Sequence, residues 1–110
     1  MDIEVALKQQ ITDNAVLLFM KGTPDFPQCG FSSQVAGALK ETEVPFSYIN
    51  ILENPEAREK LKEMSNWPTF PQLYVGGELL GGCDIIIDMY NEGELKPALE
   101  AAEAAQVAKA

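Results

Sequence analysis

The chain has 110 residues, of which 46% are hydrophobic and 23% charged, a balance that fits one globular domain and excludes a disordered or fibrous chain. Seventeen acidic and eight basic residues give a net charge of −9, which repels phosphate backbones and anionic membranes, so we expect neither nucleic acid nor membrane as a partner. Because no apolar run approaches the roughly 20 residues of a membrane span, and residues 1–4 lack the basic start of a secretory signal, we expect a cytoplasmic protein.

The first predicted element is an amphipathic helix over residues 2–13. Ile3, Leu7 and Ile11 recur at i, i+4 and i+8 with polar residues between them, the pattern of a helix that packs on a core. Residues 15–20 follow as a short apolar run and are predicted to form a buried strand. This opening part of the chain is expected to be scaffold.

The loop of residues 21–32 places Cys29 directly before a predicted helix. A thiol at a helix N-terminus meets unpaired N–H groups and the positive end of the dipole, which favour the thiolate, and Lys21 adds a cation at the other end of the loop. The alternative is an inert, buried cysteine, but the turn formers Pro24 and Pro27 surround Cys29 rather than an apolar stripe. Cys29 is therefore the candidate reactive thiol.

The segment after Cys29 is predicted to be a helix, because its apolar positions repeat at helical spacing: Phe31, Val35, Ala38 and Leu39. Residues 46–51 alternate in polarity and are rich in strand-forming side chains, which predicts a second strand. A helix between two strands indicates a right-handed crossover in which the two strands run parallel.

A further helix is predicted to start at Asn54 and to end near Ser65, with Asn54 as its cap and Pro55 at its first helical position. Arg58 lies in the first turn of this helix, where a cation is electrostatically unfavourable. Two interpretations of Arg58 therefore stand: it is placed for a ligand, or it is an ordinary solvated arginine.

Residues 72–75 and 78–80 are predicted to form two strands of a hairpin joined by the two-glycine turn of residues 76–77. Pro71 stands directly before the first strand, and a cis bond between Phe70 and Pro71 is one way to enter that strand. The large apolar side chains nearby and in the next helix are assigned to the core or its rim: Met64, Trp67, Phe70 and Met89.

Residues 81–82 are glycines that precede Cys83 and Asp84 and predict a turn into another helix, with Asp84 near its cap. Helix N-termini bind anions, but two glycines and a cap also begin ordinary helices, so this signal is weak alone. One last helix is predicted to dock through three residues, with the Ala-rich end from about residue 101 frayed. The docking residues are Leu95, Ala98 and Leu99.

The chain contains two cysteines and no histidine. A closed zinc site takes about four ligands, usually Cys or His, so one chain cannot build it. A disulfide between Cys29 and Cys83 is arithmetically possible, but nothing in the sequence brings the two together, and cytosolic thiols are normally reduced. That pairing is left open.

Four motifs stand in order along the chain: Lys21-Gly-Thr-Pro, Cys29-Gly-Phe-Ser32, Trp67-Pro-Thr-Phe-Pro-Gln72 and Gly81-Gly-Cys-Asp84. Together they closely resemble the monothiol glutaredoxins of the Cys-Gly-Phe-Ser class, single-domain bacterial type, over about residues 3–100. The resemblance implies one α/β domain over residues 1–110 with the thioredoxin-like fold, a four-stranded mixed sheet flanked by about five helices.

The resemblance also implies a glutathione site made by six residues: Lys21, Arg58, Phe70, Pro71, Cys83 and Asp84. The two cations would bind the glycine carboxylate, the backbone of Phe70 would pair with the cysteine of glutathione, and the last two residues would hold the γ-glutamyl end. This implication favours the ligand interpretation of Arg58, because an anionic partner offsets its unfavourable helix position.

The resemblance further implies a [2Fe–2S] cluster, with Cys29 as its metal ligand, shared between two subunits. Such a cluster takes four thiolates. One Cys29 from each of two chains and one glutathione from each site would supply them, so Cys83 need not be a ligand. The cluster-bound form would then be a homodimer.

Two functions follow from the resemblance. As a carrier in iron–sulfur cluster biogenesis, the protein would receive a cluster from a scaffold, pass it to apo iron–sulfur proteins and pair with a BolA-type protein. As an enzyme, it would use Cys29 as a catalytic thiol to reduce glutathione mixed disulfides. Ser32 stands where a second cysteine would resolve a protein disulfide, which disfavours the enzyme. The family also favours the carrier, so we expect at most weak glutathione-dependent oxidoreductase activity.

Overall fold

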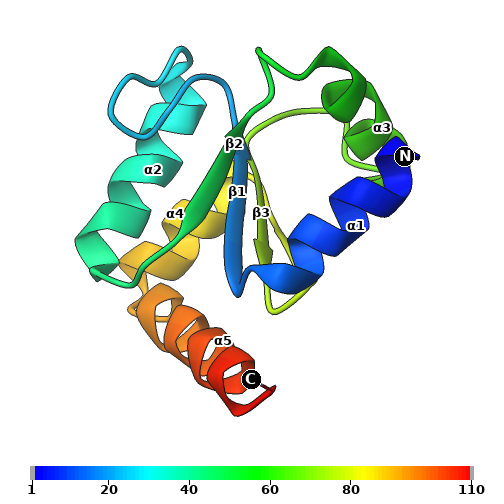
Figure 1. The fold of residues 1–110 in the computed structure, drawn as a ribbon. Helices are drawn as coiled ribbons and strands as arrows, with labels where there is room; N and C mark the ends of the chain where they lie inside the picture. Colours follow the sequence, from blue (N-terminus) through cyan, green and yellow to red (C-terminus); the bar gives the residue numbers. More distant parts are fainter. Residues whose placement is uncertain (1, 110) are drawn as a thin grey trace.

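The computed structural model describes residues 2–109, in which four strands and five helices are present (Figure 1). The two ends of the predicted 1–110 domain, Met1 and Ala110, lie outside the described residues. In chain order the elements are α1 (Ile3–Asp13), β1 (Val16–Met20), α2 (Gly30–Thr42), β2 (Ser47–Asn50), α3 (Pro55–Ser65), β3 (Gln72–Val75), β4 (Glu78–Gly81), α4 (Cys83–Asn91) and α5 (Leu95–Lys109).

The strands form one mixed sheet in the order β2-β1-β3-β4. β1 and β2 run parallel, with Leu18 opposite Tyr48, which confirms the crossover predicted through α2. β1 and β3 run antiparallel, with Leu18 opposite Leu73, and β3 and β4 form the predicted hairpin. The predicted thioredoxin-like class, a four-stranded mixed sheet with five helices, is confirmed.

Helices cover both faces of the sheet, with α2 and α4 on one face and α1 and α3 on the other (Figure 1). Successive side chains of a strand point to opposite faces, so β1 contributes to two separate cores. Leu18 and Met20 pack with α2, α4 and α5, whereas Leu17 and Phe19 pack with α1 and α3. Burial on both faces explains why β1 is apolar at every position.

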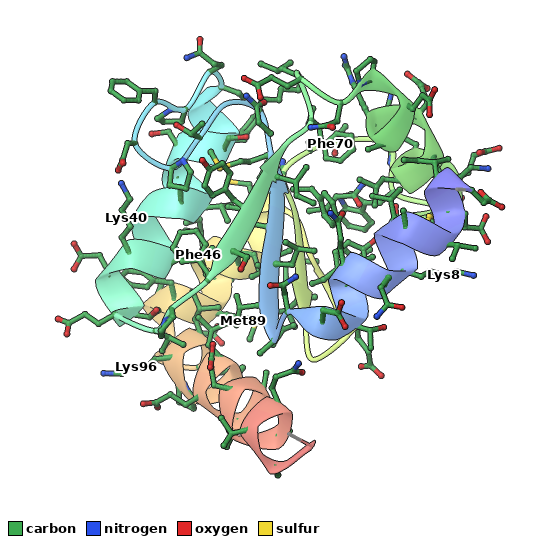
Figure 2. The ribbon with its side chains drawn as sticks, in the orientation of Figure 1. Lys8, Lys40, Phe46, Phe70, Met89 and Lys96 are labelled. Atoms are coloured by element: carbon green, nitrogen blue, oxygen red, sulfur yellow. The ribbon has the colours of Figure 1, made fainter. Side chains whose placement is uncertain are left out.

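Buried and exposed side chains separate as the periodicity predicts in most of the elements. Phe70 lies in the core between the sheet and α3, while Lys8, Lys40 and Lys96 lie on the outer surface (Figure 2). Within residues 2–109, none of the helices has both the length and the apolar composition needed to cross a bilayer.

Helix α3 begins after Asn54 and ends at Ser65, where the sequence places it. The side chain of Asn54, however, makes no capping hydrogen bond within the helix. Its amide instead donates to the backbone oxygen of Asn50 at 2.9 Å, which ties the start of α3 to the end of β2. The position of the cap was predicted correctly, and its mechanism was not.

Helix α2 buries three of the four apolar positions whose spacing predicted it, and Phe31 is the exception at 58% exposure. The first turn of α2 lies beside Lys21, the residue that follows β1, because the backbone N–H of Lys21 donates to Ser32 Oγ at 3.1 Å. Phe31 thus lies at the edge of the sheet rather than over it. The helix that this spacing predicts is confirmed, but Phe31 does not share the buried face of the other three residues.

The C-terminal helix α5 docks through Leu95 and Leu99, both buried, with Ala98 partly buried beside them. The helix continues to Lys109, past the point near residue 101 where the sequence predicts fraying. Fraying itself stays a prediction, because it concerns the dynamics of the helix end.

Candidate functional site

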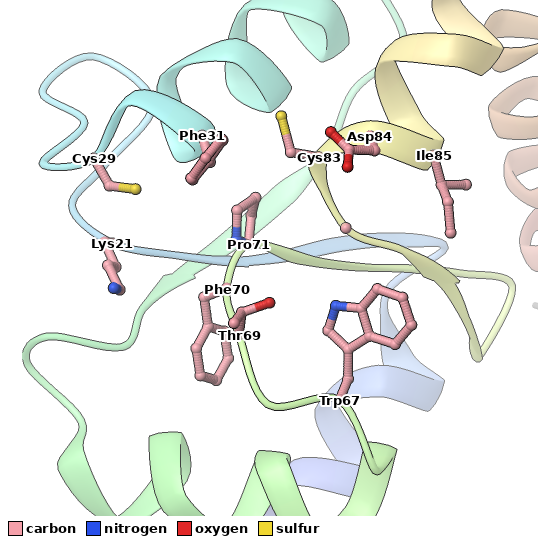
Figure 3. Close-up of a pocket in the computed structure, with 11 residues that line it drawn as sticks. Lys21, Cys29, Phe31, Trp67, Thr69, Phe70, Pro71, Cys83, Asp84 and Ile85 are labelled. Carbon is pink, nitrogen blue, oxygen red and sulfur yellow. The ribbon is translucent and has the colours of Figure 1, made fainter.

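A pocket of about 530 Å³ lies at one edge of the sheet, and three separate parts of the chain form its walls (Figure 3). The parts are the loop before α2 with its first turn, the segment before β3, and the start of α4. The lining residues are Lys21, Cys29, Phe31, Trp67, Thr69, Phe70, Pro71, Gly82, Cys83, Asp84 and Ile85.

The register of the sheet brings these three parts together. β1 and β3 are antiparallel neighbours with Phe19 opposite Gln72, so the end of β1 lies beside the start of β3. Leu73 pairs with Gly81 at the end of β4, which places the start of α4 at the same edge. The loops that follow or precede these strand ends therefore converge on one pocket.

Cys29 is the N-cap residue of α2, with extended backbone angles and no capping hydrogen bond from its side chain. The backbone N–H of Ser32 is the main cause that lowers the pKa of the Cys29 thiol below its ordinary value. Partial burial acts in the opposite direction, while the Phe31 N–H and the charge of Lys21 lower the pKa further. A lowered thiol pKa favours the thiolate, the form that attacks disulfides and binds metals.

Ser32 has a structural role that the sequence analysis missed. Its side chain is fully buried, and its Oγ accepts the hydrogen bond from the backbone N–H of Lys21 at 3.1 Å. The residue therefore joins the end of β1 to the first turn of α2, three positions after Cys29. A buried serine beside a helix start gives no distinctive sequence signal, because its partner is set by the fold.

The loop before Cys29 is held at its start by two interactions. The N–H of Gly22 donates to Asn50 Oδ1 at 2.9 Å, and Gly22 pairs with Pro27 across the loop. Gly22 has φ +93°, and a Cβ there would lie 2.6 Å from the backbone oxygen of Phe26. Only glycine fits this position. The loop thus presents Cys29 from a fixed scaffold.

The segment before β3 contains the cis bond between Phe70 and Pro71 that the sequence suggested. Trp67, assigned from sequence to the core or its rim, forms part of the pocket wall. A Cβ at Gly82 would lie 3.1 Å from the indole nitrogen of Trp67, so the ring packs closely on this backbone. Glycine at position 82 therefore allows two walls of the pocket to meet.

Cys83 differs from Cys29 although both thiols line the pocket and both are free. Burial raises the pKa of the Cys83 thiol, and the charges of Asp84 and Cys29 raise it further. Its Sγ donates to the side-chain oxygen of Gln34 at 3.6 Å. Cys83 is therefore held in the thiol form. The disulfide left open by the sequence is not formed in this structure.

Arg58 does not line the pocket, unlike the other five residues predicted to bind glutathione. It lies in the first turn of α3, and its Nε is buried without a hydrogen-bond partner among residues 2–109. The neighbouring Ala57 packs with α1 and α3, which places this turn on the other side of the sheet from α2. The role of Arg58 in glutathione binding stays a prediction.

Charge is distributed unevenly along the pocket. Of its lining residues, Lys21 is the cation and Asp84 is the anion; Figure 3 shows Lys21 near Cys29 and Asp84 next to Cys83. The rest of the lining includes the apolar side chains of Phe31, Trp67 and Ile85. Within residues 2–109, no three His, Cys, Asp or Glu side chains gather closely enough to hold a metal ion.

A three-layer fold with a thiol at the start of α2 and a cis-proline before β3 defines the class of thioredoxin-like proteins. The sequence model described as Glutaredoxin matches residues 16–80, more than half of the chain. The chain therefore belongs to the glutaredoxin family.

Its relatives include monothiol glutaredoxins, as the motifs predicted. Glutaredoxin 4 of Haemophilus ducreyi is 54% identical over 94 residues, which cover 86% of this chain and 88% of that protein. The chloroplastic monothiol glutaredoxin-S14 of Arabidopsis thaliana is 55% identical over 96 residues, covering 87% of this chain and 56% of the relative. The solution structure of reduced poplar apo GrxS14 matches with a TM-score of 0.79 and 52% identity, covering 93% of this chain and 94% of the other.

Proposed function

We propose that this protein is a carrier of [2Fe–2S] clusters, which it holds between two subunits through Cys29 and bound glutathione. One observation carries the proposal: the thiolate-favouring Cys29 lies at a pocket with the buried Ser32, rather than a second thiol, three residues away. A single ligand per chain suits a cluster that is shared and then released. A vicinal pair would instead suit internal disulfide chemistry.

The pocket supports glutathione as the second thiol ligand. Its volume of about 530 Å³ falls within the range of small-molecule sites, roughly 300–1,000 Å³. Glutathione carries a carboxylate at its glycine end, a charged γ-glutamyl group at the other end and a thiol between them. In the proposed complex Lys21 pairs with the glycine carboxylate, the backbone of Phe70 beside Pro71 meets the cysteine, and Cys83 and Asp84 hold the γ-glutamyl end.

The donor set of one chain also fits a shared cluster. A [2Fe–2S] cluster takes four thiolates, and Cys29 is the one pocket thiol whose pKa is lowered. Cys83 fits a ligand role poorly, because its pKa is raised and its Sγ is engaged with Gln34. Two chains and two glutathione molecules complete the set, so the cluster-bound form is a homodimer.

The remaining parts of the proposal rest on the family. The protein works in the cytoplasm, receives its cluster from a scaffold, delivers it to apo iron–sulfur proteins and pairs with a BolA-type protein. In this role the cluster is cargo rather than a reagent, and Cys29 binds it without chemical turnover.

Anaerobic reconstitution with iron, sulfide and glutathione tests the carrier function. We expect a coloured dimer with about two irons per two chains, and no colour when glutathione is left out. Cys29→Ser should stay colourless, while Cys83→Ser should still assemble the cluster. A colourless monomer formed by the unaltered chain would overturn the proposal, and equal loss in both variants would make Cys83 a ligand.

A second function is favoured by the partial exposure of Cys29 together with its lowered pKa. As a glutathione-dependent oxidoreductase, the Cys29 thiolate would attack the glutathione sulfur of a mixed disulfide and release the protein thiolate. A second glutathione thiolate would then attack the glutathionylated Cys29, release oxidised glutathione and restore the thiolate. Deglutathionylation of a model peptide by the cluster-free protein measures this activity, and a rate equal to that of Cys29→Ser would exclude it.

A further inference from the structure

We propose that Gln72 is a positioning residue that sets the shape of the pocket by holding the segment of residues 67–71 in place. The effect on binding rests on the proposed glutathione site, but the positioning itself is a property of the fold. Neither the motifs nor the pocket lining assigns Gln72 a role, because its side chain lies behind the pocket wall.

Two hydrogen bonds carry the inference. Gln72 is the first residue of β3 and is fully buried. Its side-chain Nε2 donates to the backbone oxygen of Trp67 at 3.0 Å and to that of Thr69 at 3.2 Å. Both N–H groups of the Gln72 amide thus donate to backbone carbonyls of the irregular segment between α3 and β3. These two bonds fix the curvature of that segment.

The rest of the amide is also fixed. The hydroxyl of Tyr74 lies 3.5 Å from Gln72 Oε1, and the Tyr74 ring packs edge-on against Phe19 at a centroid distance of 5.6 Å. The Gln72 side chain is therefore anchored on β3, which lies between β1 and β4 in the sheet. Through its two hydrogen bonds, the amide holds residues 67–71, which have no regular secondary structure of their own.

The held segment supplies two features of the pocket. One is Trp67, whose indole packs on the backbone of Gly82 at the start of α4. The other is the backbone of Phe70, which the proposed function uses to meet the cysteine of glutathione. Without the Gln72 amide, the Trp67 ring and the Phe70 backbone would shift relative to Cys29. Cys29 itself would stay in place, because the first turn of α2 is held by the hydrogen bond between Ser32 and Lys21.

The test replaces Gln72 with Met, which has similar length and no donor, and with Glu, which faces the two carbonyls with acceptors. Trp67 is the only tryptophan in the sequence, so its fluorescence reports on the segment directly. We expect a red-shifted emission, stronger quenching by acrylamide and glutathione binding weakened about tenfold, because two part-buried backbone hydrogen bonds are lost. The alkylation rate of Cys29 and its pH midpoint should not change.

Thr42→Val is the matched control. Thr42 is also buried, and its Oγ1 also makes two backbone hydrogen bonds, donating to Leu39 O at 2.6 Å and accepting from Val44 N–H at 3.2 Å. It lies outside the pocket lining, so this variant should lose stability while Trp67 fluorescence and glutathione affinity stay unchanged. Equal changes in both variants would show that Gln72 acts through stability alone and would overturn the proposal.

Two further outcomes are decisive. Unaltered Trp67 fluorescence in a folded Gln72→Met variant would overturn the positioning role whatever glutathione does. If the original chain binds no glutathione, the proposed function fails, and the fluorescence comparison still decides the role of Gln72. If the Met variant does not fold, Gln72→Asn replaces it, because Asn keeps the amide on a shorter side chain. This variant should show a smaller red shift of the Trp67 emission. A folded Asn variant without any shift would contradict the proposal.

Discussion

The two cysteines have the same chemistry as free residues, and their surroundings separate them. Cys29 stands at a helix start, where the N–H of Ser32 lowers its pKa. Cys83 is the first residue of α4, where burial raises its pKa and its Sγ donates a hydrogen bond to Gln34 Oε1. One pocket thus holds one thiol whose pKa is lowered and one whose pKa is raised.

This difference predicts an order of alkylation. A lowered pKa means that Cys29 gains its thiolate at lower pH than an ordinary cysteine, and a raised pKa means that Cys83 gains its thiolate at higher pH. With iodoacetamide, the pH–rate midpoint of Cys29 should lie below that of Cys83, measured on Cys83→Ser and Cys29→Ser. Lys21→Met should raise the midpoint of Cys29. Coincident midpoints would contradict the separation.

Lys21 and Arg58 are predicted to bind the same carboxylate, but the structure places them differently. Lys21→Ala should weaken glutathione binding by about 1 kcal/mol, because a partly exposed charged hydrogen bond is lost. Arg58→Ala should weaken it as well if the side chain turns toward the ligand, which its unpartnered Nε would allow. Calorimetry on the cluster-free protein measures both. If Arg58→Ala binds glutathione with unchanged affinity, Arg58 is an ordinary solvated arginine and not a glutathione-binding residue.

The loop between β1 and α2 is held by interactions that are distant in sequence. Asn50, at the end of β2, accepts the N–H of Gly22, and Lys40, near the end of α2, donates to the backbone oxygen of Pro24 and pairs with Asp25 at 3.0 Å. The loop is therefore fastened to both of the elements that follow it. These contacts therefore fix the position of Cys29.

Gly22→Ala tests how much the loop depends on its backbone conformation. The new methyl would meet Phe26 O at 2.6 Å with φ at +93°, so we expect a loss of about 1–3 kcal/mol in the free energy of unfolding. Gly37→Ala is the control, because Gly37 lies inside α2 with nothing within 4 Å and should gain about 0.5–1 kcal/mol. Denaturant titration compares them, and equal stability of the two variants would contradict the strained loop.

At the scale of the whole molecule, the net charge of −9 bears on assembly. Two such chains repel each other at long range, so the proposed dimer depends on the shared cluster and its glutathione ligands rather than on attraction between the bare subunits. Phe31 and Ile85, exposed at 58% and 41%, lie at the same pocket as Cys29 and give that face its apolar surface.

The sequence by itself determined the elements, their order and the chemistry of the reactive thiol. Helical and strand periodicities are local, so spacing alone predicted that Leu7 and Ile11 pack on a core and that Val35 and Leu39 belong to a helix; all four are buried. The position of Cys29 before a helix is likewise a property of adjacent residues. Four ordered motifs then supplied the family, because together they are far more specific than a single cysteine.

Only the tertiary structure decided which side chains meet at the pocket. The burial of Ser32, the exposure of Phe31 and the absence of Arg58 from the lining depend on how the helices pack on the sheet, and the packing of Trp67 on Gly82 depends on the register of β1, β3 and β4. That register joins residues up to about 60 positions apart, and local spacing carries no information on such contacts. The reactive group was therefore predictable from its neighbours in sequence, whereas the walls around it were set by the sheet.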